Sequence, residues 1–425
     1  MTLNRAEELR NKFWQQDIQY NNGLIWKQYN QIKKVLNDID MNWVNERLME
    51  IKSHAIKSTS YYKDMDVNGV FPVVNKATLL ENYEEHMAVS GFDLPIHKSS
   101  TSGSTGTPFT VIQDYKKRMR TIADLKVFGE LCNYPSHERM IFFRVLSKNN
   151  RTAEQEEAEN IFYIDSSNLN ELNLNYMAGE INKKKPRIIL GYSSTIVELA
   201  KYICGYIDNY RCTLTSVLAI GEGLEDCDRK LVEKVFNCKV YRRYSDMELG
   251  ILGQDSGDGG KYFLNWGSYF FEVLKLEKDE PAGEGELGRI VITDLFNKAF
   301  PMIRYDTGDL GILECTDRER FPYLREIYGR KRDCVYTTNG SLVSPAKISV
   351  SMWGCKNVRQ WQFIQTDKAT YILKINPYYL PYEDKDMVYK LRTVLGFDAE
   401  IKVELVSEIP VLSSNKRRAV ICEIK

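Results

Sequence analysis

The sequence predicts an α/β protein: a large N-terminal domain with a parallel α/β sheet and a β-rich subdomain, then a small, mobile α+β C-terminal domain. The chain has 425 residues, about three times the length of a typical domain. Short β-rich runs alternate with amphipathic helical patterns between residues 140 and 244, which is typical of a parallel sheet covered by helices. After Gly267 the pattern changes to longer alternating strands, which indicates the β-rich subdomain.

The composition is that of a globular protein without a global charge. Hydrophobic residues make up 43% of the chain and aromatic residues 12%, enough for a sizeable core. The 58 Lys and Arg residues balance the 58 Asp and Glu residues, so no overall field attracts nucleic acid or an anionic membrane. No apolar run approaches the ~18 residues of a membrane span, and the charged start does not resemble a signal peptide. We therefore expect a cytoplasmic protein with no nucleic-acid partner and no membrane span.

Cysteine and histidine are too scattered to predict a metal centre built from them. The nine cysteines contain no C-x-x-C pair, so they are expected to be reduced and buried. The four histidines include no H-E-x-x-H or H-x-H spacing and leave little material for a Ser-His-Asp triad. Chemistry is therefore expected from glycines, hydroxyls, carboxylates and lysines.

The first ~60 residues are predicted to form a helical preamble, because apolar residues such as Ile25, Tyr29 and Ile32 recur at helical intervals. Their expected role is packing. An extended turn at Phe71-Pro72-Val73-Val74 then leads into a charged helix from Lys76 to about Met87.

The α/β sheet is expected between about residues 90 and 265. Its predicted strands are Met140 to Leu146, Ile161 to Ile164, Ile188 to Leu190, Leu214 to Ile220 and Lys239 to Tyr244, and its predicted helices are Ser194 to Ile207 and Leu224 to Phe236. Ligands of such sheets bind at the carboxyl ends of the strands, so the loops after these strands are candidate sites.

The β-rich subdomain is expected between about residues 267 and 331. Its strands, Tyr269 to Leu276 and Arg289 to Leu295, flank a Gly- and Glu-rich turn. The N-terminal domain would then end at 331, and residues 332–425 would form the C-terminal lid domain.

The strongest local signal is the segment from Ser100 to Pro108, S-T-S-G-S-T-G-T-P. Small residues let the backbone approach a ligand closely, and clustered N–H and O–H donors suit phosphate oxygens. It is not a P-loop, because no Lys-Ser or Lys-Thr follows its second glycine. A flexible linker is the alternative, but ordered patterns flank the segment, which favours a polyphosphate-binding loop.

A second candidate, Tyr241 to Gly250, directly follows a predicted strand. Tyr244 offers a flat face to a purine, and Glu248 offers an oxygen ligand to Mg²⁺. Taken alone, this pattern is also compatible with an ordinary strand end.

Three further segments carry candidate residues. Asp309 follows a Thr-Gly turn, and its two oxygens match the vicinal diol of a ribose. The segment from Gly329 to Asp333 lies where the second domain is expected to begin, and the segment from Ser413 to Arg418 would alone be interpreted as a solvated basic tail.

In this order and at these intervals, the five segments resemble motifs of the adenylate-forming (acyl- and aryl-CoA synthetase) superfamily. Its [ST]-S-G-[TS]-[TS]-G-x-P loop, Y-G-x-[ST]-E segment, Y-x-T-G-D segment, G-R-x-x-D hinge and late G-K-x-x-R lysine appear here in turn. The short, helical start is similar to the phenylacetate:CoA ligase branch and its capsular-polysaccharide relatives. The resemblance covers essentially the whole chain.

The resemblance implies a role for each matching residue. Tyr244 would stack on the adenine with Ser245 beside it, Glu248 would bind Mg²⁺, Asp309 would bind the ribose and Arg330 the ribose or a phosphate. Lys416 would contact the substrate carboxylate and the α-phosphate, and Arg332 and Asp333 would form the hinge. The loop residues implied to hold the β- and γ-phosphates are Thr101, Ser102, Gly103, Ser104, Thr105 and Gly106, and those beside the adenine are Gly221, Glu222 and Gly223.

The chain departs from the family pattern at three positions. Ser245 replaces a glycine, Met247 replaces the Ser or Thr before Glu248, and Asn415 replaces the glycine before Lys416. The change at Met247 removes a hydroxyl that in the family lies near the α-phosphate. The Cys and His ligands of the structural zinc found in many members of the branch are missing from residues 252–257, so we expect no zinc.

The function implied by the resemblance is ATP- and Mg²⁺-dependent activation of a small carboxylic acid to an acyl-adenylate, with release of pyrophosphate. Metal and lysine neutralise charge as the carboxylate attacks, so no general base is needed. The acyl group would then pass to a thiol, from CoA or the phosphopantetheine of a carrier protein.

Two alternatives remain open at this stage. The first is acyl transfer to an amine or hydroxyl of a sugar or glycan precursor in polysaccharide biosynthesis. The second is a non-catalytic nucleotide-binding homologue, which the presence of both Glu248 and Lys416 disfavours. Dimers are common among relatives, so a homodimer is a further expectation.

Overall fold

The computed structural model describes residues 4–38, 40–100, 109–146, 151–205, 213–315, 322–330, 334–343, 345–352, 357–383, 385–409 and 419–424. These residues form two compact units. The larger contains the described residues up to Thr307 together with 312–315 and 322–326. The smaller contains Gly308 to Gly311 and the described residues from Ile327 onward.

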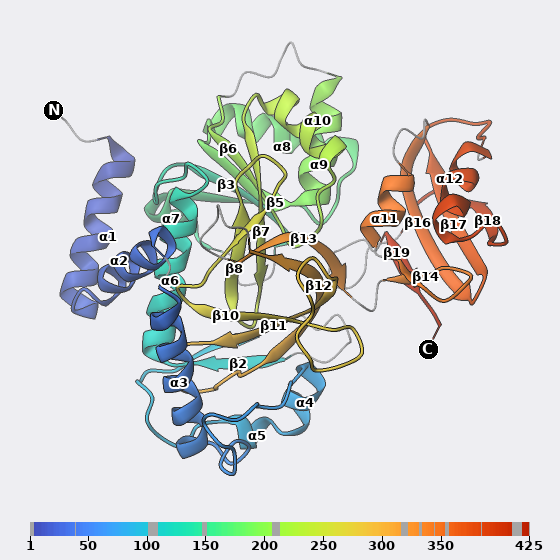
Figure 1. The fold of residues 1–425 in the computed structure, drawn as a ribbon. Helices are drawn as coiled ribbons and strands as arrows, with labels where there is room; N and C mark the ends of the chain where they lie inside the picture. The colour runs from blue at the N-terminus through green and yellow to red at the C-terminus, as the bar shows by residue number, and fades with distance from the viewer. Residues whose placement is uncertain are drawn as a thin grey trace. The chain divides into compact units, whose positions relative to one another are not determined.

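Helices occupy the start of the larger unit (Figure 1), namely α1 (Arg5–Asn21), α2 (Leu24–Asn37), α3 (Met41–Ser58), α4 (Lys76–Glu81) and α5 (Tyr83–His86). Asp17, buried in α1, organises the α1–α2 turn, because its two carboxylate oxygens accept the N–H groups of Ile25 (3.1 Å) and Trp26 (2.9 Å). The single helix expected from Lys76 to Met87 is instead two short helices. Asn82 interrupts it, with a non-helical backbone (φ −115°, ψ 35°).

The described residues of the chain contain one eleven-stranded sheet, with the strand order β10-β11-β12-β13-β9-β8-β7-β6-β5-β3-β4. Its parallel part consists of β3 (Met140–Arg144), β4 (Ile161–Asp165), β5 (Ile188–Tyr192), β6 (Ser216–Ile220) and β7 (Lys239–Asp246). Its other strands are β8 (Gly250–Asp255), β9 (Tyr262–Leu264), β10 (Tyr269–Leu274), β11 (Gly288–Asp294), β12 (Tyr305–Glu314) and β13 (Tyr323–Arg330). The β-rich strands therefore extend the parallel sheet instead of forming a separate one.

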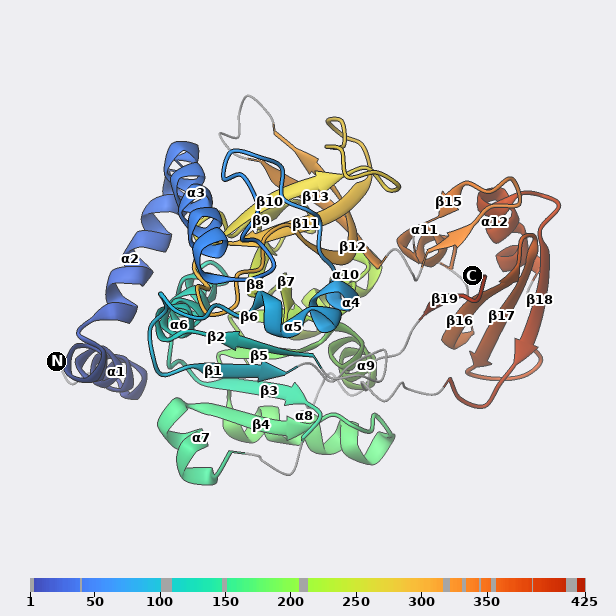
Figure 2. The same cartoon turned by 90° about the horizontal axis from the view of Figure 1, so that it is seen from below.

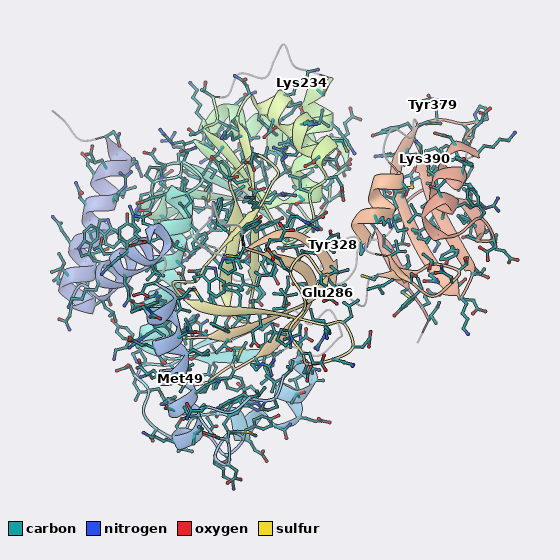
Figure 3. All side chains as sticks on the ribbon, viewed as in Figure 1. Met49, Lys234, Glu286, Tyr328, Tyr379 and Lys390 are labelled. Carbon is teal, nitrogen blue, oxygen red and sulfur yellow. The ribbon has the colours of Figure 1, made fainter. Side chains whose placement is uncertain are left out.

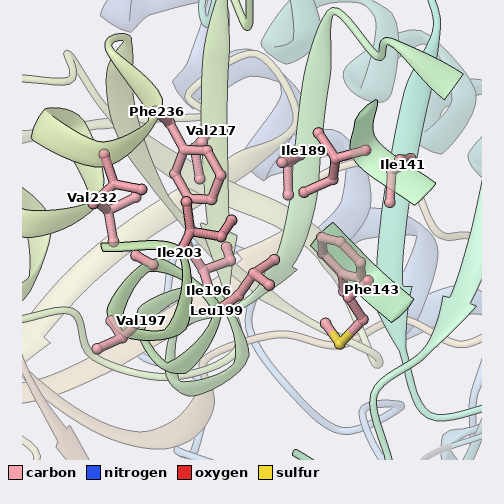
Figure 4. Close-up of a cluster of buried hydrophobic side chains, with 14 of the residues drawn as sticks. Ile141, Phe143, Ile189, Ile196, Val197, Leu199, Ile203, Val217, Val232 and Phe236 are labelled. Carbon is pink, nitrogen blue, oxygen red and sulfur yellow. The ribbon is translucent and has the colours of Figure 1, made fainter. Parts of the chain in front are cut away.

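Helices α8 (Glu171–Lys184), α9 (Ser193–Cys204) and α10 (Asp226–Phe236) cover one face of the parallel strands. Alternate strand residues such as Ile141, Ile189 and Val217 point into this layer, where they meet Ile196 and Phe236 (Figure 4). Each fully buried side chain of this kind stabilises the fold by about 1.5–3 kcal/mol. The helices and strands together confirm the predicted α/β fold class.

The opposite face of the sheet is contacted by the end of α6 (Tyr115–Glu130) and the residues after it, where Cys132 and Tyr134 pack against Met140, Leu218 and Tyr241. Two other elements of this region are α7 (Ala153–Glu159) and the hairpin of β1 (His97–Ser100) with β2 (Thr110–Gln113), visible in Figure 2. The sequence pattern did not reveal α6, because three of its buried residues, Lys117, Arg120 and Asp124, are charged.

The smaller unit has its own sheet, of order β18-β17-β16-β19, with its own hydrophobic core. Its elements are β14 (Val335–Tyr336), β15 (Leu342–Val343), α11 (Pro345–Ser351), β16 (Val358–Asp367), β17 (Thr370–Pro377), α12 (Lys385–Leu395), β18 (Glu400–Leu405) and β19 (Val420–Cys422). On α12, Leu391 is fully buried, whereas Lys390, labelled in Figure 3, forms an ion pair with Asp386 one turn earlier (Nζ–Oδ2 3.1 Å). None of the helices in the described ranges combines the length and apolarity needed to cross a membrane.

Candidate active site

The order β4-β3-β5-β6-β7 places a topological switch point between β3 and β5, because β4 and β5 flank β3 on opposite sides. In open α/β sheets ligands bind in the crevice beyond the carboxyl ends of the strands at such a point. Since these strands are parallel, the residues that follow β5, β6 and β7 lie along one edge. This edge carries the candidates Gly221 to Gly223 and Ser245 to Glu248.

Glu222, expected beside the adenine, also caps helix α9. Its Oε2 accepts the backbone N–H of Ser194 (2.9 Å), and its backbone carbonyl accepts the hydroxyl of Ser193 (3.1 Å). A carboxylate at a helix N-terminus is favoured by the helix dipole. The other oxygen, Oε1, is buried and has no hydrogen-bond donor among the described residues. Gly221 has a φ of +74°, a left-handed conformation that glycine adopts without strain.

Tyr244 lies near the end of β7 and is only 9% exposed. Its hydroxyl donates to the hydroxyl of Thr307 (3.4 Å), which in turn donates to the carbonyl of Ile290 (3.0 Å). The structure therefore joins two segments that the sequence analysis singled out separately, the one around Tyr244 and the one beginning at Tyr305.

Glu248 lies in the turn from Asp246 to Gly250, which connects β7 to β8, and is half-buried. The backbone of this turn is held at several points. Oδ1 of Asp246 accepts the N–H of Leu249 (2.6 Å), and the hydroxyl of Tyr269 donates to the carbonyl of Leu249. Gly250 has a φ of +117°, which favours glycine, and a β-carbon there would lie close to the Tyr269 hydroxyl, at 3.2 Å.

A buried network of charged and polar side chains supports the turn between β7 and β8. Lys117 on α6 forms an ion pair with Asp294 (Nζ–Oδ2 2.7 Å) and donates to the Tyr269 hydroxyl (3.0 Å). All three side chains are almost fully buried, and burial raises the pKa of Tyr269 well above its usual value. Tyr269 therefore stays a neutral donor toward Leu249. A buried ion pair is stable only when further hydrogen bonds satisfy it, and this one is so satisfied.

Ser99 connects the predicted phosphate loop to the same turn. Its hydroxyl donates to the carbonyl of Met247 (2.9 Å), and β1, which contains Ser99, leads directly into the predicted loop. The side chain of Met247 is 60% exposed, so only its backbone takes part in this contact.

The structure places two more of the predicted site residues, at least in their backbone. Asp309 lies in β12 and is half-buried, and Arg330 ends β13, with its side chain not described. The remaining candidates lie outside the described residues, namely Thr101, Ser102, Gly103, Ser104, Thr105, Gly106, Arg332, Asp333 and Lys416.

In the described part of the chain, no group of three or more His, Cys, Asp or Glu side chains is arranged to hold a metal ion. Mg²⁺ usually takes one or two protein carboxylates together with substrate phosphates and water. Glu248, half-buried in a well-anchored turn, fits such a single ligand.

The fold described above is shared with solved CoA ligases. The chain matches the solved 2-hydroxyisobutyryl-CoA ligase, in the postadenylation state with R3-HIB-AMP, at a TM-score of 0.71 and 17% identity, over 89% of each chain. It also matches the O-succinylbenzoate coenzyme A synthetase of Bacillus subtilis in complex with AMP, at a TM-score of 0.53 and 14% identity, over 76% of this chain and 67% of that one. The resemblance to the adenylate-forming superfamily is thus confirmed in the fold.

A second similarity is to a curated protein and covers most of the chain. This chain is 23% identical to Protein CapK of Staphylococcus aureus, and the alignment covers 93% of this chain and 92% of the CapK chain. Residues 335–423, within the smaller unit, match the CapK C-terminal domain.

Ser99, Asp246, Lys117, Tyr269 and Asp294 were not among the residues predicted from sequence. Each of these side chains either hydrogen-bonds to a backbone carbonyl or N–H group or contacts a side chain that is distant in sequence. No local sequence motif therefore identifies it.

Proposed function

We propose that this protein is an adenylate-forming ligase that activates a carboxylic acid with ATP and then transfers the acyl group to a thiol, from CoA or a carrier protein. The observation that carries this proposal is the fold shared over 89% of both chains with a ligase solved with its acyl-AMP, together with five motifs in matching order. In the first step a carboxylate oxygen attacks the α-phosphorus, and the bond to pyrophosphate breaks.

Each candidate residue has a role in this proposal. The loop from Thr101 to Gly106 holds the β- and γ-phosphates, Gly221 to Gly223 with Tyr244 and Ser245 hold the adenine, and Asp309 and Arg330 hold the ribose end. Lys416 neutralises charge on the carboxylate and α-phosphate, delivered by movement about Arg332 and Asp333. A magnesium ion held by Glu248 would supply further neutralisation of phosphate charge.

The experiment is pyrophosphate release with Mg-ATP across a panel of aryl, short-chain, hydroxy and amino acids, without CoA. Release with one class of acid supports the first half-reaction. No release with any acid, while ATP still binds, would contradict the catalytic assignment and favour a non-catalytic nucleotide-binding protein.

Similarity to Protein CapK favours one alternative for the second half-reaction, transfer to an amine or hydroxyl of a sugar or glycan precursor. The preformed acyl-adenylate is offered to CoA, to a phosphopantetheinylated carrier and to amino- and hydroxy-sugars. Thioester formation supports the main proposal, whereas an amide or ester formed only with the sugar supports the alternative.

A further inference from the structure

One face of the parallel sheet stays partly open toward its carboxyl edge. The face with Ile141, Ile189 and Val217 is sealed by helices. On the opposite face, Phe142, Leu190, Tyr192 and Ile220 remain half-buried, although none of their strands is at an edge of the sheet. They lie beside the switch point between β3 and β5, where a substrate of such a sheet is expected.

The register between neighbouring strands extends this half-buried surface from β5 across β6 to an arginine on β7. Tyr192 on β5 lies opposite Ile220 on β6, Ile220 lies opposite Arg243 on β7, and Arg243 lies opposite Gln254 on β8. Alternation places Arg243 on the face of Tyr241, away from helices α8 to α10. Arg243 directly precedes Tyr244, the proposed adenine contact.

Two neighbouring arginines on β7 have different cross-strand partners. Arg242 forms an ion pair with the buried Asp255 (Nε–Oδ2 2.7 Å), so its charge is compensated. Arg243 instead donates from Nε (3.0 Å) and Nη2 (2.9 Å) to Oε1 of Gln254, a neutral amide. Among the described residues, no carboxylate forms an ion pair with Arg243.

A half-buried guanidinium without a counter-charge is costly, and burial lowers the pKa of Arg243. Gln254 is kept in place because its Nε2 donates to the carbonyl of Phe128 (3.2 Å). Two of the five N–H donors of Arg243 serve Gln254, which leaves donors for the two oxygens of another oxyanion.

A second cation lies on the same face. Arg144 ends β3 and is exposed, with its guanidinium 5.6 Å from the ring centre of Phe142 and 5.9 Å from that of Tyr163. Among the described residues it has no carboxylate partner. The nearby carboxylate of Glu222 is engaged by the start of α9. This face therefore presents the guanidinium groups of Arg144 and Arg243, neither of them in an ion pair among the described residues, beside half-buried apolar side chains, with Asp165 as the register partner of Arg144 on β4.

We propose that the acid activated by this protein carries a second negatively charged oxygen group, which Arg243 binds, and that it is a dicarboxylic acid. This inference rests on the proposed function. One carboxylate attacks the α-phosphorus of ATP as pyrophosphate leaves, while the other stays ionised against Arg243 and takes no part in bond making. An acid with a distal phosphonate also offers a second anionic group that an arginine can bind. It is therefore tested separately.

The test compares acids in matched pairs by pyrophosphate release: glutarate with butanoate, adipate with pentanoate, isophthalate with benzoate, and a phosphonoalkanoate of glutarate's length. For the dicarboxylates, kcat/KM should exceed that of the monocarboxylates by about 10- to 100-fold, the range expected for a charge-assisted hydrogen bond. If the phosphonate had a higher kcat/KM than the dicarboxylates, Arg243 would still be the binding residue. The assignment of the substrate as a dicarboxylic acid would then be wrong.

Two variants address the charge. Gln254→Glu supplies a protein carboxylate to Arg243, as Asp255 does for Arg242, and should abolish the preference for the second anionic group. Arg243→Gln should do the same. Arg187→Gln, at the exposed residue just before β5 on the opposite edge of the sheet, is the matched control and should keep the wild-type preference.

Calorimetric titration of glutarate into protein saturated with a non-hydrolysable ATP analogue provides a readout without turnover. Glutarate should bind the wild type at least about 10-fold more tightly than the Gln254→Glu variant. Equal use of monocarboxylates and dicarboxylates, unchanged in Arg243→Gln, would overturn the inference and leave the proposed function intact. Absence of pyrophosphate release with every acid would instead count against the proposed function itself.

Discussion

At the scale of single residues, the candidate site contains charged side chains with few oppositely charged or hydrogen-bonding partners. Glu248 is half-buried in a turn, and Glu222 divides its oxygens between a helix start and a buried position. Arg243 meets an amide where its neighbour Arg242 meets a carboxylate. A buried polar group without a full set of partners lowers the stability of the fold unless a bound ligand supplies the missing partner. Such groups therefore indicate where a ligand is expected to bind.

Lys416→Ala should abolish acyl-adenylate formation while ATP binding remains largely intact. The lysine is proposed to neutralise charge that develops only as the carboxylate attacks, so its loss affects the reaction far more than ground-state binding. Pyrophosphate release and ATP titration measure the two effects. Lys402→Ala, an exposed lysine on β18, is the control, and unchanged release in Lys416→Ala would rule out the role of this residue.

His137→Asn should make stability less sensitive to acid. Burial, followed by the nearby charges of Lys126 and Arg10, lowers the pKa of His137 to about 3. Below pH 6.5 the unfolded chain therefore binds a proton that the folded chain does not, and stability falls as the pH drops toward 3. Because His137 is partly exposed, we expect the loss between pH 7 and pH 5 to shrink by about 1 kcal/mol in the variant.

Urea unfolding at the two pH values measures this difference. Asparagine is chosen because the backbone of His137 is left-handed (φ +66°), a conformation that asparagine tolerates. Partial burial, followed by the charge of Arg118, also lowers the pKa of the more exposed His97, so His97→Asn should reduce the acid sensitivity by less than His137→Asn does. An unchanged loss in His137→Asn would contradict the burial argument.

At the scale of elements, the turn between β7 and β8 is the most closely supported part of the candidate site. Its backbone is bonded by Ser99 from β1, by Asp246 within the turn and by Tyr269 from β10. These contacts come from elements far apart in sequence, so the position of Glu248 depends on the packing of α6, β10 and β11 around Lys117. Loops carry function best when a rigid scaffold holds them in this way.

Tyr269→Phe should lower kcat/KM for ATP by about 10-fold, because small displacements of a positioned group are costly in catalysis. It removes only the hydroxyl, which donates to the carbonyl of Leu249 and accepts a hydrogen bond from Lys117. Nucleotide affinity measured with Mn²⁺ and again with EDTA should show a smaller metal-dependent gain in the variant.

Tyr134→Phe is the control for this variant, because Tyr134 is also buried and donates a comparable bond, to the carbonyl of Glu138 (3.0 Å). If both variants lose activity equally, the effect is general destabilisation. If Glu248→Gln keeps the metal-dependent gain, the assignment of Glu248 itself is wrong.

At the scale of the whole molecule, each of the two units has a hydrophobic core among its described residues, and these two cores share no residue. One lies under α8 to α10 in the larger unit, and the other under α12 in the smaller. Units with separate cores can unfold in separate steps.

Leu391→Ala, in the core of the smaller unit, should destabilise that unit by about 3 kcal/mol. Calorimetry should show one transition moving to lower temperature while the other stays in place. Ile196→Ala, in the core of the larger unit, should move the other transition. A single transition that shifts in both variants would show that the units unfold together.

The sequence by itself predicted the alternation of strands and helices, the fold class and the residues of the five motifs, because hydrophobic periodicity and short motifs are local properties. It did not reveal α6, whose buried face carries Lys117, Arg120 and Asp124, nor that the β-rich strands extend the parallel sheet. Both depend on partners distant in sequence.

Only the tertiary structure decided which side chains meet. The strand register paired Arg242 with an acid and Arg243 with an amide, and the packing of α6 on β10 placed a tyrosine hydroxyl under the turn of Glu248. Neighbouring residues with the same side chain thus acquired opposite electrostatic surroundings. Burial and partner charge, which determine what a group can bind, arise only when distant segments come together.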